Sequence, residues 1–388
     1  MDLVYLFICI IFLGFFFNKK VSSNETWRAT ITPLASIIGS GFLIAAPILN
    51  SLNSKYSYLL MLGLCCATYC IGIIIRWNIQ NVEENSSSYI SEKLSDIFLS
   101  IAYILSVSYY LYLLSSFILK ATSLHGLDLE RGLTTLIVCS IAYYGHQHGF
   151  KSLEKVESIS VNIKLSIIFT FLVSLIVFNI QNDSPVAQEK AFDFDVIRVL
   201  LGLVIMVQGF ETSRYLGSSY SSKIRVTSMR NAQLISTGIY LLFIILFSSV
   251  FILYPLSGAI EETSVIDAAK HVFRVAPVLI LLAALSSQLS AALADMSGCG
   301  GLIGEFSKGK ISERNSYILI AILILVIIWS FNIFEVISLA SKGFALYYLL
   351  QCISSAKYYF RRSLSRLSFS LFVGLFCLAV VILGLPFE

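Results

Sequence analysis

Four charged side chains lie inside long apolar runs of the sequence, where a charge is costly: Lys164, Glu211, Asp295 and Lys342. Such residues in a membrane protein usually face a cavity or pair with one another. Glu211 directly follows Gly209 and Phe210, which favours a role at a binding site over a brace between helices. Asp295 and Lys342 are a candidate internal charge pair, for which Lys164 is an alternative cation.

Two apolar runs are interrupted by residues that favour unwinding, Gly39-Ser40-Gly41 in one and Gln208 to Ser213 ("QGFETS") in the other. Backbone N–H groups from Ser40 to Phe42 would begin a new half-helix, whose positive end attracts a carboxylate. Carbonyl groups before Gly209 would accept hydrogen bonds from an ammonium group. One interruption alone is explained as well by close helix packing. The matched pair instead predicts a site for a zwitterion such as an amino acid.

The composition is that of an integral membrane protein, because 57% of the residues are hydrophobic and 13% are charged. The net charge of +4 lies mostly in loops and indicates orientation, not nucleic-acid binding. All eight cysteines fall in apolar stretches without metal-ligand spacing, which predicts no metal site and no disulfides. No nucleophile–base pair appears in the apolar runs, so we expect neither an enzyme nor a cofactor.

The apolar runs predict an all-α, polytopic fold with about twelve membrane-spanning helices in one transmembrane domain, residues 1–388. Setting aside an extra N-terminal helix (2–18) and an extra C-terminal one (367–386) leaves two groups of five, 29–179 and 196–352. Because five is odd, the second group has the opposite orientation. The predicted helices are 2–18, 29–51, 57–76, 95–120, 132–146, 156–179, 196–217, 231–255, 276–304, 315–331, 333–352 and 367–386.

The distribution of Lys and Arg over the predicted loops indicates the orientation of the chain. If the first helix is retained and enters from outside, the inside loops hold 18 basic residues and the outside loops hold 7. The positive-inside rule therefore places both termini outside the plasma or inner membrane.

The interrupted runs resemble the amino acid–polyamine–organocation (APC) superfamily of secondary transporters, with a LeuT-like five-plus-five inverted repeat. The resemblance rests on "IIGSGFL" from Ile37, "QGFE" from Gln208, and "GFKSLEKVESISVNIKLS" from Gly149. It implies that the first break holds the substrate carboxylate and that the second supplies carbonyls for its amine. The substrate-binding residues implied by the resemblance and the half-helix argument are Gly39, Ser40, Gly41, Phe42, Gln208, Gly209, Phe210 and Glu211.

Two coupling patterns of the resembling transporters compete at one place in this sequence. Proton-coupled or uncoupled members carry a lysine in the fifth repeat helix, which Lys164 matches. Sodium-coupled relatives bind the ion there with carbonyls and hydroxyls, which Ala35, Ile38, Ala283, Ser286 and Ser287 match. An ammonium group and a sodium ion would repel each other strongly in a low-dielectric cavity, so we favour the lysine and proton coupling. Ser286, Ser290 and Ser297 also form a small polar face that could hold an ion or pack closely.

The sequence thus predicts a secondary active transporter of an amino acid or related small amine that works by alternating access. Its partners are a small-molecule substrate and the lipid bilayer; substrate identity and oligomeric state are left open. A sodium symporter and a substrate-sensing receptor on a transporter scaffold remain the alternatives. Where acidic residues and a proline commonly follow the sixth repeat helix in the family, this chain reads "GSSYSSKIRVTSMRNAQ".

Overall fold

A computed structural model describes residues 2–82, 90–122, 126–182, 190, 192–217, 219–255, 264–331 and 333–385. Every regular element in these ranges is a helix. The elements in chain order are α1 (Asp2–Phe16), α2 (Lys19–Ser22), α3 (Glu25–Ile37), α4 (Ser40–Leu52), α5 (Ser57–Asn81), α6 (Ile90–Ala121), α7 (Leu127–His148), α8 (Phe150–Gln181), α9 (Phe194–Gly202), η2 (Leu203–Val207), η3 (Phe210–Tyr215), α10 (Ser222–Leu253), α11 (Ser264–Ala269), α12 (Ala276–Phe306), α13 (Glu313–Ser330), α14 (Ile333–Tyr359) and α15 (Leu364–Leu383).

Long apolar helices make up the fold because lipid offers no hydrogen-bond partner to a backbone, and a helix satisfies its own. Seven helices are long and apolar enough to cross a membrane, and α3 with α4 would make an eighth span. The all-α, polytopic prediction is confirmed, but length and composition do not confirm the count of twelve. Apolar α1 and α13 fall below the spanning length. The short helices α2 and α11 were not predicted.

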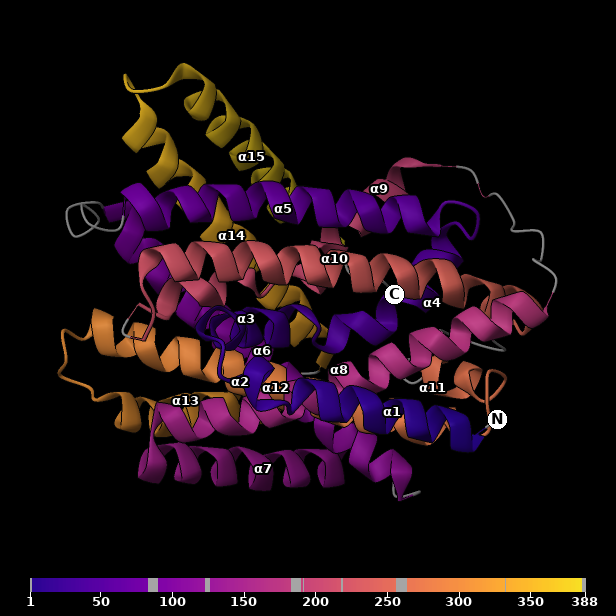
Figure 1. Cartoon of the computed structure of the whole chain (residues 1–388). Helices are drawn as coiled ribbons and strands as arrows, with labels where there is room; N and C mark the ends of the chain where they lie inside the picture. Colours follow the sequence, from indigo (N-terminus) through magenta and orange to yellow (C-terminus); the bar gives the residue numbers. More distant parts are fainter. Residues whose placement is uncertain are drawn as a thin grey trace.

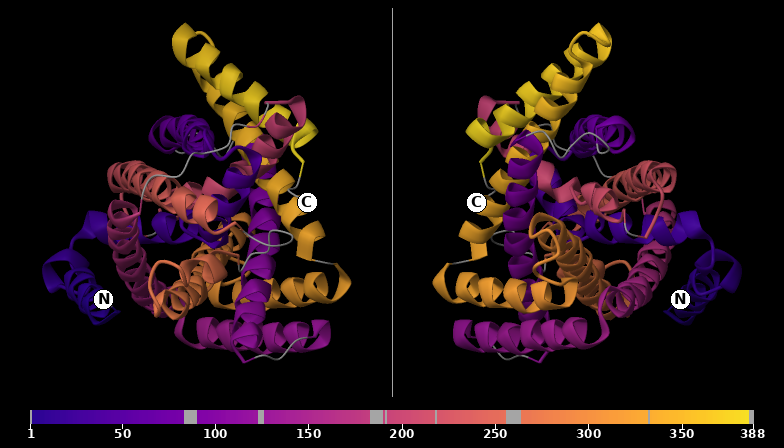
Figure 2. Two further views of the ribbon diagram at one scale, coloured as in Figure 1. Left: turned by 90° about the vertical axis from the view of Figure 1, so that its right-hand side faces the viewer. Right: turned by 90° about the vertical axis from the view of Figure 1, so that its left-hand side faces the viewer.

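Helices α6 and α12 form the centre of the molecule. Helix α6 packs against α12 and α14, and α12 packs against α8 as well. Helices α3 and α5 both pack against α10. Figure 1 shows α1 at the outside of the bundle against α8, and α15 leaning away from it; Figure 2 shows the same arrangement from both ends. The interrupted helices therefore lie between well-packed neighbours.

The first predicted interruption is a true break. Helix α3 ends at Ile37, α4 begins at Ser40, and the two are bent by 47°. Gly39 lies between them with φ −93° and ψ −142°, outside the helical region. The last carbonyls of α3 are consequently free to bind groups other than the next helical turn.

The second predicted interruption is more extensive than a single break. Helix α9 ends at Gly202, and the chain continues as the 3₁₀ segments η2 and η3 in place of the α-helix predicted over 196–217. Gly209 separates these segments with φ +115°, a left-handed value that favours glycine. A Cβ at Gly209 would also lie 2.4 Å from Ser36 Oγ, so the two broken helices touch at this residue.

Candidate functional site

The two breaks pack directly against each other, and glycine permits the contact on both sides. A Cβ at Gly41 would lie 2.8 Å from Met206 Cα, which is backbone and cannot move aside cheaply. Tyr240 joins the same two segments, since its hydroxyl lies 3.0 Å from Ile37 O and 2.7 Å from Met206 O. Tyr240 could not be singled out from the sequence, because it is one of twenty tyrosines.

Lys164 of α8 reaches the free end of α3. Its Nζ donates hydrogen bonds to Ala35 O at 2.8 Å and to Ile38 O at 2.6 Å. It also donates to Ser290 Oγ at 2.8 Å, and the side chain is fully buried. The C-terminal end of a helix carries partial negative charge, so an ammonium group is stabilised there.

Hydroxyl groups of α12 complete this cluster, although not all of the predicted ones take part. Ser287 Oγ lies 2.6 Å from Ile38 O and 3.1 Å from Gly39 O. Ser290 accepts the lysine hydrogen bond and lies 3.1 Å from Ser287 O. Within the described contacts, Lys164 reaches neither Ala283, which is buried, nor Ser286, which is half-buried. Lys164 therefore bonds the hydroxyl of Ser290, which lies one helical turn after Ser286, a predicted ion ligand.

Glu211 holds the second break in shape. Its Oε2 accepts the backbone N–H of Gly209 at 2.9 Å and the hydroxyl of Tyr348 at 2.8 Å. The side chain is fully buried, and its Oε1 lacks a hydrogen-bond partner in the described part of the chain. Oε2 thus braces the break by joining Gly209 to Tyr348 of α14.

The remaining predicted side chains surround the breaks. Gln208 Nε2 lies 3.4 Å from Tyr110 Oη. Phe210 stacks on Tyr348 with ring centroids 5.5 Å apart. Phe42 packs against Tyr240, with centroids 5.2 Å apart. The side chain of Ser40 lies outside what the structure describes.

The predicted charge pair between Asp295 and Lys342 is wrong. Asp295 is fully buried, and its two oxygens lie 2.8 Å from Ser36 Oγ and 2.5 Å from Ser106 Oγ. Lys342 is exposed on α14. Lys164, the alternative cation, bonds to carbonyls and Ser290 instead of Asp295. The position of these residues along their helices could be predicted from the sequence, but the face of the helix on which each lies could not.

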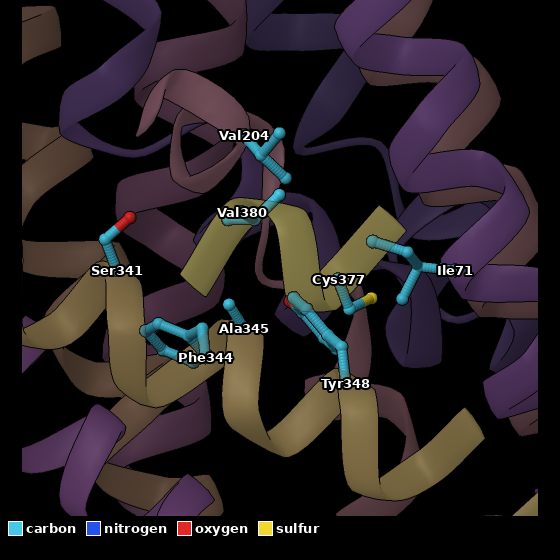
Figure 3. A pocket seen from close by; sticks show the side chains of 8 residues that line it. All are labelled: Ile71, Val204, Ser341, Phe344, Ala345, Tyr348, Cys377 and Val380. Atoms are coloured by element: carbon cyan, nitrogen blue, oxygen red, sulfur yellow. The ribbon is translucent and has the colours of Figure 1, made fainter. Parts of the chain in front are cut away.

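A small cavity lies behind Tyr348, the residue that donates to Glu211. Its volume is about 10 Å³, which is room for about one water molecule. Figure 3 shows it between α14, α15, η2 and α5. The lining residues of the cavity are Ile71, Val204, Ser341, Phe344, Ala345, Tyr348, Cys377 and Val380.

No group of three or more His, Cys, Asp or Glu residues suited to a metal occurs in the described ranges.

Comparisons with known proteins agree with this architecture. A family profile described as APC superfamily transporter matches residues 19–384. An uncharacterized protein of Aquifex aeolicus (strain VF5) is 41% identical over 354 residues, which is 89% of this chain and 87% of the relative. The crystal structure of MhsT in complex with L-phenylalanine, a LeuT-fold transporter, superposes with a TM-score of 0.61 at 13% identity, over 92% of this chain and 98% of MhsT. The LeuT-like fold class is confirmed.

Proposed function

Since this chain belongs to the APC superfamily of transporters, we propose that it carries an amino acid or a related small amine across the membrane by alternating access, with proton coupling through Lys164. The observation that carries the proposal is the contact of the Lys164 ammonium group with Ala35 O and Ile38 O, at the break of the first interrupted helix. A proton gained or lost by this group changes what holds that break, and so links protonation to the substrate site.

The substrate assignment rests on the two breaks. The N-terminal end of α4 begins at Ser40, and its free N–H groups favour a carboxylate. The 3₁₀ segment before Gly209 leaves carbonyl groups for an amine. MhsT, whose fold this chain shares, has been crystallised with the amino acid L-phenylalanine. That ligand supports an amino acid here without identifying which one.

Proton coupling is favoured over sodium coupling because the Lys164 ammonium group bonds two of the carbonyl groups that were predicted as sodium ligands. The ammonium nitrogen lies 2.6–2.8 Å from the carbonyl oxygens that a sodium ion would need. Two unit charges about 4 Å apart repel by about 4 kcal/mol at an effective dielectric constant near 20. A sodium ion could therefore enter only after Lys164 lost its proton or moved away.

Uptake into proteoliposomes tests the proposal. We expect an inward proton gradient to drive accumulation of an amino acid in the absence of sodium, and Lys164→Met to abolish the response to the gradient. Lys342→Met is the matched control, because it removes an exposed lysine from a helix and should leave uptake unchanged. Uptake that requires sodium and survives Lys164→Met would establish the sodium alternative. Ligand binding without any flux would indicate a receptor instead.

A further inference from the structure

Two fully buried carboxylates near the breaks have only neutral partners. Asp295 is bonded by the hydroxyls of Ser36 and Ser106. Glu211 is bonded by a backbone N–H and the hydroxyl of Tyr348. The two lie close enough for their charges to interact, and the buried Lys164 is held elsewhere. A buried carboxylate without a cation is costly, so this arrangement favours a positively charged ligand.

The position of Asp295 places its carboxylate next to the first break. Tyr110 of α6 and Ala291 of α12 both adjoin Gly39: a Cβ there would lie 3.7 Å from Tyr110 Oη and 3.3 Å from Ala291 Cβ. Residues four apart on a helix share a face. Ser106 lies one turn before Tyr110, and Asp295 lies one turn after Ala291, so their hydrogen bond joins α6 to α12 beside Gly39.

Several polar atoms on the segments that meet at this contact, α6, α12 and the second break, have no hydrogen-bond partner within the described part of the chain. They are buried and consist of oxygens alone: Tyr103 Oη, Gln208 Oε1, Glu211 Oε1 and Ser297 Oγ. Tyr103 interacts electrostatically with both carboxylates, and a Cβ at Gly298 would lie 3.1 Å from its ring. Gln208 Oε1 and Glu211 Oε1 are acceptors, the hydroxyls of Tyr103 and Ser297 can turn to accept, and an ammonium group supplies three donors.

We propose that Asp295 and Glu211 receive a second positive charge, so that the substrate carries an ammonium or guanidinium group at the end of a short aliphatic chain besides its first amine. This inference rests on the proposed transport function. The distance from Gly39 to the Asp295 level is about one helical turn, or 5.4 Å, which a chain of three or four methylenes spans. Basic amino acids such as lysine and ornithine, and diamines such as cadaverine, share this chemistry.

Thermal stabilisation of the purified protein in detergent tests the inference, because a ligand of the folded state raises the unfolding temperature by mass action. The probes are L-lysine, L-ornithine, cadaverine and L-norleucine, which has the aliphatic chain of lysine without the terminal ammonium group. We expect stabilisation by lysine or ornithine at concentrations at least about 30-fold below those that norleucine needs, since a buried charge pair contributes that much or more. Stabilisation by cadaverine as well would show that the carboxylate of the substrate is dispensable.

Variants locate the effect. Asp295→Asn should weaken lysine binding by about 30-fold or more and leave norleucine binding unchanged or stronger. Asp195→Asn is the control, because the same chemical change falls on an exposed residue of α9. If Asp295→Asn does not fold, Glu211→Gln is tested in the same way, and the comparison of lysine with norleucine on the native chain needs no variant.

The outcomes separate this inference from the proposed function. Equal or tighter binding of norleucine than of lysine by the native chain would overturn the inference and leave amino acid transport standing, as would lysine binding unaffected by Asp295→Asn. Stabilisation by none of these compounds, nor by any other amino acid or amine, would overturn both.

Discussion

Lys164 is the residue on which the proposed proton coupling depends, and its contacts predict a change of ion preference. Lys164→Ala removes the ammonium group and leaves Ala35 O, Ile38 O and Ser290 Oγ buried without their donor. We expect the free energy of unfolding to fall by about 3 kcal/mol. Because oxygens of this kind also bind cations, sodium chloride should raise the unfolding temperature of the variant more than choline chloride does.

The native chain is the reference for that measurement, and its unfolding temperature should respond equally to the two salts. Lys342→Ala controls for the loss of a lysine from a helix, because its side chain is exposed. A variant at Lys164 that is as stable as the native chain, or that ignores sodium, would contradict the role of the ammonium group at this break.

Tyr240 gives a second prediction at the residue scale. Its hydroxyl is shared by Ile37 O and Met206 O, which belong to the two interrupted helices. Tyr240→Phe keeps the ring and its contact with Phe42, and should lower the free energy of unfolding by about 1 kcal/mol. The uptake rate should fall by a larger fraction than the free energy of unfolding, because the two broken helices lose a hydrogen-bond donor that they share. Tyr254→Phe, at the exposed end of the same helix, should change neither; equal effects of the two substitutions would refute this role.

At the scale of elements, the sequence predicted where helices would break but not how they would continue. Gly39 to Gly41 and Gly209 lie at the breaks because a Cβ at Gly41 or Gly209 would strike the other interrupted helix. The 3₁₀ form of η2 and η3 is a tertiary effect, since an apolar stretch from Leu203 to Val207 reads locally as an ordinary helix. The prediction of an Asp295–Lys342 charge pair was wrong for a related reason. The rotation of α12 and α14 about their own axes is set by packing against neighbouring helices, which the sequence does not identify.

The contact between the broken helices predicts opposite results for two glycine substitutions. Gly41→Ala places a Cβ within 2.9 Å of three Met206 atoms, so the half-helix α4 must move away from η2. We expect the free energy of unfolding to fall by about 2 kcal/mol and uptake to be lost. Gly238→Ala is the matched control in α10, where nothing lies within 4 Å, and it should raise stability by up to about 1 kcal/mol. Comparable stability of the two variants would mean that the breaks tolerate separation.

At the scale of the whole molecule, the uneven distribution of basic residues between the two ends of the bundle predicts how the chain is oriented in the membrane. Figure 1 shows the N-terminus at one end of the bundle and the turn between α12 and α13 at the other. That turn carries Lys308 and Lys310, and loops predicted on its side hold 18 of the 27 basic residues. Basic loops stay on the cytoplasmic side, so we propose that the N-terminus lies outside the cell membrane.

Epitope tags on intact cells measure this orientation. A tag at the N-terminus should bind an antibody without permeabilisation, whereas a tag inserted beside Gly309, in the turn between α12 and α13, should bind only after it. Gly309 suits the insertion because nothing lies within 4 Å of the position of its Cβ. The reverse pattern would place Lys164 and the free end of α3 on a path from the opposite side of the membrane. The direction in which protons reach the site would then be inverted, although the contacts within the site would stand.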